Sequence, residues 1–554
     1  MFFQSKFVSS LEKVFCRQNL TCKEIYTVSG ARGEKIAFQL VCQASEITHI
    51  QIDYELPWAD QDIFAIREVG LVPSFNPAVA DDPYIISSEP GLYPDPLLKM
   101  QDNRTRISAK NWHSFWCSVD IPQNMSPGKY EIKFHIFTPQ DLKIWLPPEM
   151  HHYTSIIIEV LPFELPEQQL ICTNWFHYDC LAIKYNVDIW SEEYWKLLEV
   201  YFQNMVAHGI NMIMTPLWTA PLDTAINEER PTAQLLQIKY FNNEYQFDFS
   251  RLERYLQLAK KCRFKYFEMP HAFTQWGAKA CPKIVAETAS GNNEKIFGWH
   301  TAANSAEYRN FLQSLMPQLL QVFKKYDLNK ENTFFHISDE PTDKMLQEYS
   351  YASNLLRQLI ENYPLIDALS HVELYRQGVI EIPIPTVEVI DDFTDENLPQ
   401  RWLYYCGCNY KNGVPNCAFG MPSIRNRIIG ILMYIYQIEG FLHWSYNFWF
   451  SQNSLNYDLD PYKDPEAGKG FTGGDVCRVY PGDNGPVDSL HYEIFAEALQ
   501  DLRALQLLEK KIGREKVVEL LHCGISPLKC SNYPKDNDWL LKVRSRINQA
   551  IMEN

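Results

Sequence analysis

The sequence predicts an α/β protein with an all-β N-terminal domain and a helical C-terminal tail. Residues 1–165 consist mostly of strand-like runs separated by turns, which favours a β-sandwich domain. Residues 166–510 alternate between strand and helix patterns, which is typical of a (β/α)8 TIM-like barrel. Residues 511–554 have a helical pattern and form the expected C-terminal extension.

Four runs in the N-terminal domain alternate in part between apolar and polar side chains. Clusters of Pro, Gly, Asn and Asp separate these runs, as expected for turns between the strands of a sheet. The segment 161–170 contains two prolines and predicts a short linker to the next domain. The expected strands cover residues 34–44, 113–122, 128–138 and 154–163.

The second domain contains eight strand-like runs, each followed by a helix or a connecting loop. Eight such units over roughly 340 residues match the size of a (β/α)8 barrel. A doubly wound sheet is the alternative, and its ligand crevice would also lie at the C-terminal ends of the strands. The expected strands cover residues 169–176, 209–216, 263–270, 333–338, 365–370, 385–390, 401–406 and 440–447. The expected helices lie near residues 190–208, 249–262, 303–326, 342–361, 423–438 and 488–509.

Composition and charge limit the classes of partner. The chain has 554 residues, of which 46% are hydrophobic and 14% aromatic, so it contains enough apolar side chains for large cores. The formal net charge of -17 repels phosphate backbones and anionic membranes, so we expect no nucleic acid and no membrane as partner. The most apolar long stretch, residues 427–444, is interrupted by Arg427, Gln437 and Glu439, which predicts a buried helix and strand.

The cysteines and the N-terminus indicate a reducing compartment. Fourteen cysteines show no paired framework, which predicts free thiols. The closest group, Cys406, Cys408 and Cys417, lacks the spacing of a zinc site, and no glycine-rich phosphate loop is present, so we expect no metal and no cofactor. Lys6 and Glu12 interrupt the apolar core that a signal peptide needs, which predicts a cytoplasmic protein. The sequence leaves assembly into a homo-oligomer open.

Polar and aromatic residues follow the expected barrel strands at their C-terminal ends, where barrel enzymes hold their active sites. Indole faces pack against the C–H faces of sugar rings, while Asn, His and Asp hydrogen-bond to hydroxyl groups. This combination indicates a saccharide-binding site. The alternative is that each tryptophan packs in the barrel core and that each histidine only hydrogen-bonds to the backbone. The expected substrate-binding residues are Trp175, His177, Asp179, His271, Gln275, Trp276, Trp299, Tyr405, Trp444, Asn447 and Trp449.

Two adjacent acids, Asp339 and Glu340, end the fourth expected barrel strand directly before Pro341. Acids near the start of the 342–361 helix complement its dipole, which accounts for one acid but not for two. Two close carboxyl groups do not ionise together without cost, so one stays an anion while the other keeps a proton. Glycosidic cleavage needs both: a proton for the leaving oxygen and a negative charge near the anomeric carbon.

The spacing of the two acids leaves two routes open. In an ordinary retaining reaction a second carboxylate attacks carbon across about 5–5.5 Å, and side chains adjacent on a strand diverge. A third acid from another strand would then be needed. In a substrate-assisted reaction the sugar's own 2-acetamido oxygen attacks, and neighbouring acids suit this route better. The candidate third acids are Glu268, Glu373, Glu388 and Asp391.

Several longer motifs resemble glycoside hydrolase family 123 over nearly the whole chain. "FHISDEP", at residues 335–341, is the strand end that marks the wider group of related barrel proteins. The combination of motifs is more specific than this strand end alone. The other matching segments are residues 95–100, 112–137, 174–182, 208–224, 271–284, 297–303, 440–449 and 473–493.

This resemblance implies an exo-acting, retaining β-N-acetylgalactosaminidase that uses substrate assistance. By the resemblance, Asp339 polarises the acetamido group and Glu340 is the catalytic acid and base. A glycosidase for β-N-acetylglucosamine or for a sugar without the acetamido group is one alternative. A non-catalytic glycan-binding protein, in which the sandwich domain binds the ligand, is another.

Overall fold

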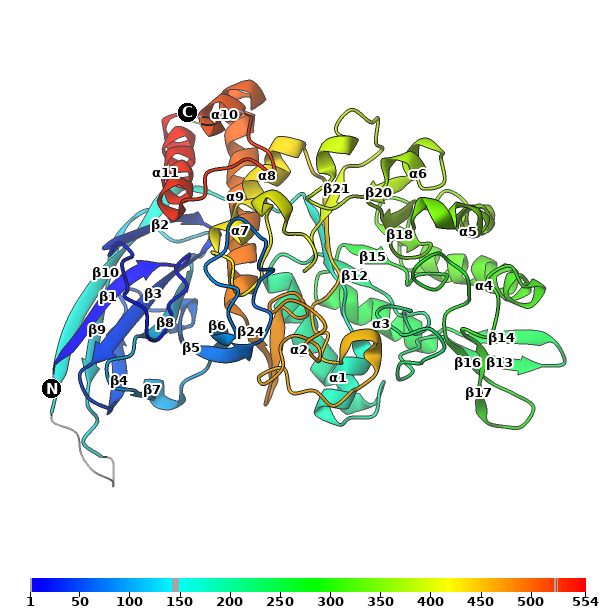
Figure 1. Cartoon of the computed structure of the whole chain (residues 1–554), viewed down its shortest axis with the longest axis horizontal. Coiled ribbons are helices and arrows are strands. Elements are labelled where there is room, and N and C mark those ends of the chain that lie inside the picture. Colours follow the sequence, from blue (N-terminus) through cyan, green and yellow to red (C-terminus); the bar gives the residue numbers. More distant parts are fainter. Residues whose placement is uncertain (1, 142–148, 523–524, 526) are drawn as a thin grey trace. The chain divides into compact units, whose positions relative to one another are not determined.

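A computed structural model shows how these elements are arranged along the chain (Figure 1). The structure describes residues 2–141, 149–522, 525 and 527–554. Within these residues, no helix combines the length and the apolar character that crossing a lipid bilayer requires.

The chain forms two compact units, each assembled from segments that are far apart in the sequence. Because each unit combines several segments, the domain boundaries expected near residues 165 and 510 stay predictions. The first unit contains Met1–Gln168, Cys417–Ile435 and Val487–Asn554. The second unit contains Gln169–Asn416 and Tyr436–Pro486.

Two five-stranded sheets in the first unit share one apolar core, which confirms the predicted β-sandwich. All neighbouring strands are antiparallel except β10 and β2, which are parallel. One sheet has the order β1 (Phe3–Ser9), β3 (Lys35–Ala44), β8 (His113–Asp120), β5 (Phe64–Ser74) and β6 (Gly91–Leu98). The other has the order β2 (Thr27–Arg32), β10 (His151–Glu164), β9 (Gly128–Phe137), β4 (Thr48–Glu55) and β7 (Arg104–Ile107).

The core of the sandwich follows from the alternation of side chains along each strand. On β9, Ile132, Phe134 and Ile136 are buried, while the residues between them face outward. Phe134 meets Phe7 of the other sheet with ring centroids 5.4 Å apart. The two sheets are therefore held together chiefly by apolar contact between their inner faces.

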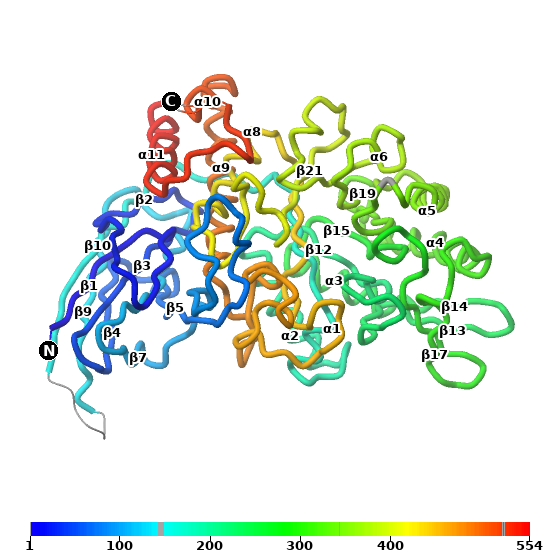
Figure 2. The backbone as a smooth tube through the Cα atoms, viewed as in Figure 1, coloured from blue at the N-terminus to red at the C-terminus, as the bar shows by residue number. Residues whose placement is uncertain are grey.

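Helices near the C-terminus belong to the first unit, and the predicted helical tail is present. Figure 2 shows α10 and α11 beside α9. Buried ion pairs link α9 to α7 and α11. Asp501 of α9 accepts hydrogen bonds from Arg427 Nε of α7 at 2.8 Å and from Arg544 Nη1 of α11 at 2.7 Å. The helices of this region are α7 (Ile424–Arg427), α8 (Ile429–Tyr436), α9 (Leu490–Ile512), α10 (Arg514–Leu521) and α11 (Asn537–Glu553).

An eight-stranded parallel sheet forms the second unit, which confirms the predicted barrel. Backbone bonds join the residues that follow the first strand of the order to the last strand: Tyr404 N donates to Pro385 O at 3.0 Å, and Val387 N donates to Tyr404 O at 3.0 Å. The sheet is thereby nearly closed. Its order is β20 (Ile382–Ile384), β19 (Leu365–Ala368), β18 (Thr333–His336), β15 (Tyr266–Glu268), β12 (Met212–Met214), β11 (Ile171–Asn174), β22 (Gly440–His443) and β21 (Trp402–Tyr404).

Helices alternate with the barrel strands, and two smaller sheets occupy the connecting loops. The helices of the second unit are α1 (Tyr178–Tyr185), α2 (Glu192–Ala207), α3 (Ser250–Lys261), α4 (Ala306–Lys325), α5 (Leu346–Leu359) and α6 (Val372–Arg376). The smaller sheets contain β14 (Glu244–Asp248), β13 (Gln237–Phe241), β16 (Ile284–Glu287) and β17 (Asn293–Phe297), and β23 (Val479–Gly482) with β24 (Gly485–Asp488). Because the barrel strands are parallel, their C-terminal ends meet at one mouth.

The sixth barrel strand lies earlier than the predicted segment 385–390. The strand is β20, which pairs with β19 through Ile382 and Ile384, and residues Ile390–Phe393 already form a 3-10 turn. Pro383 and Pro385 alternate with these isoleucines and have no N–H to donate. A proline-rich segment argues against a strand in sequence reasoning. It is tolerated here because the isoleucines make the bonds to β19.

Candidate active site

A pocket opens at the C-terminal ends of the barrel strands, and we call it the barrel-mouth pocket. Its volume is about 200 Å³, which suits a single sugar residue. Six residues predicted to bind or cleave substrate line it: Trp175, Gln275, Trp276, Asp339, Glu340 and Trp444. The other lining residues are Leu222, Asp223, Ala368, Tyr404, Cys406, Gly407, Cys408, Leu442, Phe471 and Asp475.

The backbone that leads into the acid pair is anchored by a buried carboxylate. Asp367, at the end of β19, accepts the Ile337 N–H at 3.2 Å and the Ser338 N–H at 3.0 Å. These bonds satisfy donors that have no strand partner beyond β18. They fix the point from which Asp339 and Glu340 enter the pocket.

A second anchor is the loop after β15. Ser338 Oγ donates to Thr274 O at 2.8 Å, and Trp276 N donates to Asp339 O at 3.1 Å. Glu340 and Trp276 both have positive φ, 43° and 60°, which is strained for residues with a side chain. Strain of this kind persists only where surrounding contacts hold it, and it concentrates at functional sites.

Glu340 is held by a phenol from another barrel strand, β21. Tyr404 Oη donates to Glu340 Oε1 at 2.6 Å. Burial, and then the charge of Glu340, raise the pKa of Tyr404 well above its ordinary value, so the phenol remains a donor. The helix-capping alternative is not what the structure shows. α5 begins at Leu346, and its N-cap residue, Met345, makes no side-chain cap bond.

A chain of buried hydrogen bonds runs beneath the acid pair. His336 lies between Glu268 Oε2, at 2.8 Å from Nε2, and Asp367 Oδ1, at 3.1 Å from Nδ1. Burial alone would lower the pKa of His336, but the bonds and charges of Asp367 and Glu268 raise it to about 9. The imidazolium is therefore the positive charge that compensates two buried carboxylates. Thr173 and Trp175 donate to Glu268 and complete the chain.

Two carboxyl groups in the pocket are shifted toward the protonated form. Burial raises the pKa of Asp339 well above its ordinary value, and the charges of Glu340 and Asp367 add to the shift. Burial also raises the pKa of Asp223 to about 6. The Asn453 N–H donates to Asp223 Oδ2 at 2.8 Å, and this bond lowers the pKa and offsets part of the effect of burial. Groups with such shifts in a cleft are candidates for proton transfer.

None of the four candidate third acids lines the barrel-mouth pocket. Glu268 is bound within the buried chain, and Glu373 forms an exposed ion pair with Arg376 at 2.5 Å. Glu388 accepts the N–H groups of residues 410 and 411, and Asp391 accepts the phenol of residue 436. The additional carboxylates in the pocket are instead Asp223 and Asp475.

Three predicted substrate contacts lie in a buried polar cluster beside the pocket. Asp179 forms an ion pair with Arg230 at 2.6 Å, and Arg230 also contacts His177 Nδ1 at 3.1 Å. Burial, and then the charge of Arg230, lower the pKa of His177 well below its ordinary value. Asn447 Oδ1 accepts the His177 N–H at 2.8 Å. These contacts fix the loops after β11 and β22.

The four remaining predicted contacts also lie outside the barrel-mouth pocket. Tyr405 Oη accepts Arg478 Nη2 at 3.2 Å, and Trp449 Nε1 donates to the carbonyl of Val479 at 3.2 Å. His271 is buried beside Trp175, with ring centroids 5.0 Å apart. Trp299 lines a separate pocket.

One group of side chains in the described residues that line the barrel interior has the composition of a metal site. Atoms of His271, His336 and Asp367 lie within 4.8 Å of one another. Both ring nitrogens of His336 are already bonded to carboxylates. Burial, and then the charge of His336, lower the pKa of His271 well below its ordinary value, so that ring is neutral. The imidazolium of His336 thus occupies the place that a cation would need.

Sequence reasoning missed Asp223, Tyr404, Asp475 and the loop of residues 406–408. A signal existed for Tyr404, because side chains alternate along a strand and Trp402 and Tyr404 face the barrel core together. Asp475 lies in a long loop without periodicity. It accepts Trp444 Nε1 at 3.1 Å and packs so closely on Gly407 that a Cβ there would lie 2.8 Å from Oδ2. No pattern in the sequence indicates that packing.

Comparisons with known proteins bear on the family and the fold of this chain. The catalytic-domain model of glycoside hydrolase 123 matches residues 175–508. A family 123 glycoside hydrolase from Clostridium perfringens, solved to study glycolipid glycan hydrolysis, covers 100% of this chain and 98% of its own, with 14% identity and a TM-score of 0.73. That similarity shows a shared fold. A mutant family 5 mannosidase from Rhizomucor miehei covers 65% of this chain and 97% of its own, with 12% identity and a TM-score of only 0.32. No curated protein matches the sequence.

Proposed function

The chain belongs to glycoside hydrolase family 123, and we propose that it removes terminal β-linked N-acetylgalactosamine by substrate-assisted, retaining catalysis. The observation that supports this proposal is the barrel-mouth pocket itself. It combines an adjacent acid pair with three indoles in a volume of about 200 Å³. A pocket of that size suits one terminal sugar and therefore an exo-acting enzyme.

In the first step, the acetamido oxygen attacks the anomeric carbon as the bond from that carbon to the leaving oxygen breaks. Glu340 gives its proton to the leaving oxygen, and Asp339 accepts the acetamido N–H and stabilises the oxazolinium ion. Because the pKa of Asp339 is raised, the free pair holds one proton between the two acids. Binding of the N–H by the Asp339 carboxylate favours the arrangement with that proton on Glu340.

In the second step, a water molecule opens the oxazolinium ion. Glu340, now an anion, takes a proton from the water. The water oxygen bonds to the anomeric carbon, and the bond from that carbon to the acetamido oxygen breaks. Two displacements at the same carbon give net retention. Tyr404 holds Glu340 in both roles, since its phenol donates to Oε1 throughout.

Release of p-nitrophenol from p-nitrophenyl β-N-acetylgalactosaminide tests this function. We expect turnover by the wild type and a loss of about 100-fold or more in kcat for Glu340→Gln, because glutamine cannot take the proton of the water that opens the oxazolinium ion. Loss of the acid matters less here, since p-nitrophenolate leaves with little help from an acid. Glu331→Gln is the matched control: this exposed glutamate lies before the other end of the same strand, β18. Full activity in Glu340→Gln would reject the assigned acid.

A second candidate is an ordinary glycosidase without an acetamido requirement. The observation in its favour is that Asp223 and Asp475 line the same pocket and offer further carboxylates. The p-nitrophenyl β-galactoside separates the two candidates. Substrate assistance predicts no turnover of this compound, whereas an enzyme carboxylate acting as nucleophile predicts turnover at a comparable rate. The β-N-acetylglucosaminide measures the preference at the 4-hydroxyl.

A further inference from the structure

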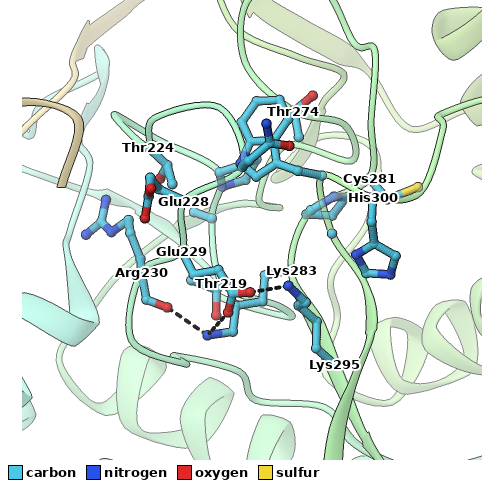
Figure 3. Close-up of a pocket in the computed structure, with 16 residues that line it drawn as sticks. Thr219, Thr224, Glu228, Glu229, Arg230, Thr274, Cys281, Lys283, Lys295 and His300 are labelled. Atoms are coloured by element: carbon cyan, nitrogen blue, oxygen red, sulfur yellow. Dashed lines mark hydrogen bonds and ion pairs between the residues drawn. The ribbon is translucent and has the colours of Figure 1, made fainter. Parts of the chain in front are cut away.

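A second pocket lies beside the active site in the same unit, and we call it the outer pocket. Its volume is about 240 Å³. Figure 3 shows Thr224 and Glu228 on one side of it and Cys281 and His300 on the other. Trp299, which the sequence predicts to be a sugar platform, is among its lining residues.

The outer pocket and the barrel-mouth pocket lie on opposite faces of one wall. Asp223 and Gln275 line the barrel-mouth pocket, while the next and the preceding residue, Thr224 and Thr274, line the outer pocket. Gln275 Nε2 donates to Thr224 O at 3.0 Å and ties the two segments of the wall together. A ligand longer than one sugar therefore needs only to cross this wall to reach the outer pocket.

Side chains without a protein partner supply the recognition groups of the outer pocket. The side chains of Asn227, Glu228, Trp299 and His300 line it, and no hydrogen bond among the described residues uses any of them. An indole, an imidazole, an amide and a carboxylate together offer a stacking face with donors and acceptors. Sugar rings present the complementary C–H faces and hydroxyl groups.

The charges of the outer pocket balance. Lys283 forms an ion pair with Glu229 at 3.1 Å and donates to the carbonyl of Arg230 at 2.9 Å, and Lys295 pairs with the other oxygen of Glu229. Figure 3 shows these contacts as dashed lines at one end of the pocket. Arg230 also lines the pocket, but Asp179 balances its charge in a buried ion pair at 2.6 Å, so with Glu228 added two lysines face two glutamates. The pocket thus favours a neutral ligand over an anion.

We propose that the outer pocket is a subsite for a neutral sugar of the glycan that leaves when the terminal residue is cleaved. This inference rests on the proposed function. An exo-acting enzyme holds the non-reducing terminal sugar in the barrel-mouth pocket, so every further sugar extends on the leaving-group side. The substrate is then an oligosaccharide chain several sugars long.

Paired substrates with one variant test the subsite. Trp299→Ala should lower kcat/KM about tenfold or more for a neutral tetrasaccharide that ends in β-linked N-acetylgalactosamine, through loss of the stacking face. For p-nitrophenyl β-N-acetylgalactosaminide, which does not reach the outer pocket, kcat/KM should change less than about twofold. His300→Ala, at an exposed position, gives a second variant with little risk to folding. Trp58→Ala, at a half-buried tryptophan of the sandwich, is the control.

Each outcome decides between the claims. Equal losses on both substrates, or no loss on the tetrasaccharide with either variant, would overturn the subsite while leaving the proposed function intact. A wild-type preference for a carboxylated glycan that Lys283→Ala abolishes would overturn the neutral assignment. Absence of turnover of both substrates by the wild type would overturn the proposed function and this inference with it.

Discussion

Replacing Tyr404 with phenylalanine tests whether the acid pair works as the structure positions it. The change removes one oxygen and with it the 2.6 Å bond to Glu340 Oε1, while the ring keeps its place in the barrel core. A hydrogen bond to a charged group contributes about 1.5–3 kcal/mol. At 1.36 kcal/mol per factor of ten in rate, its loss should lower kcat/KM about 10- to 150-fold.

The effect should appear mainly in kcat, because Tyr404 holds the acid that donates to the leaving oxygen. The assay is steady-state hydrolysis of p-nitrophenyl β-N-acetylgalactosaminide by the wild type and Tyr404→Phe. Tyr363→Phe is a matched control, since that phenol donates to the carbonyl of Leu328 at 2.9 Å and lines neither pocket. If Tyr404→Phe keeps kcat within about twofold of the wild type, the bond to Glu340 has no catalytic role.

Three further predictions concern charge and access. The folded state raises the pKa of Asp223 from 3.8 to about 6, so the free energy of unfolding of the wild type should fall as pH rises from about 4 through 6, by at most about 3 kcal/mol. Urea denaturation of Asp223→Asn should not show this fall. Identical pH profiles for the two proteins would contradict the shift. His336 has its pKa raised from 6.5 to about 9, so its contribution is present below pH 6.5 and lost as pH rises through 9. His336→Gln should therefore cost about 3–5 kcal/mol of unfolding free energy at pH 7 by leaving two buried carboxylates uncompensated, and a smaller difference at pH 7 than at pH 10 would refute this. Cys408 is exposed, and its Sγ lies 3.1 Å from the Sγ of Cys406. The hydrogen bond between the two thiols lowers the pKa of Cys408, so iodoacetamide should inactivate the wild type but not Cys408→Ser. Equal inactivation of both proteins would place the reactive thiol elsewhere.

The barrel was predictable because its elements are strongly periodic. Helix expectations near 249–262 and 303–326 correspond to α3 and α4, which differ from them by a few residues at each end. The sixth strand was misplaced because Pro383 and Pro385 lack donors, and the pairing that tolerates them depends on neighbouring strands. Local patterns record propensity, whereas strand register is decided by tertiary packing.

For the site, residues at strand ends were found more readily than residues in loops. Trp175 and Trp444 directly follow barrel strands, and Asp339 and Glu340 lie within four residues of one, so the parallel order brings them together. Loop residues such as Asp475 reach the pocket through folding that has no periodic signature. His177 and Asp179 stand beside Trp175 in sequence, yet they serve an ion-pair cluster with Arg230. The sequence does not show which of several polar neighbours faces the cavity.

Stepwise fluorination of the substrate's acetamido group tests the central claim most directly. Fluorine withdraws electrons from the acetamido oxygen and weakens its attack on the anomeric carbon, while the leaving group stays the same. If that oxygen is the nucleophile, kcat/KM for the p-nitrophenyl β-N-acetylgalactosaminide series should fall with each added fluorine from none to three. A flat series would mean that the acetamido group takes no part in bond formation, and the assignment of Asp339 and Glu340 to substrate-assisted cleavage would fail.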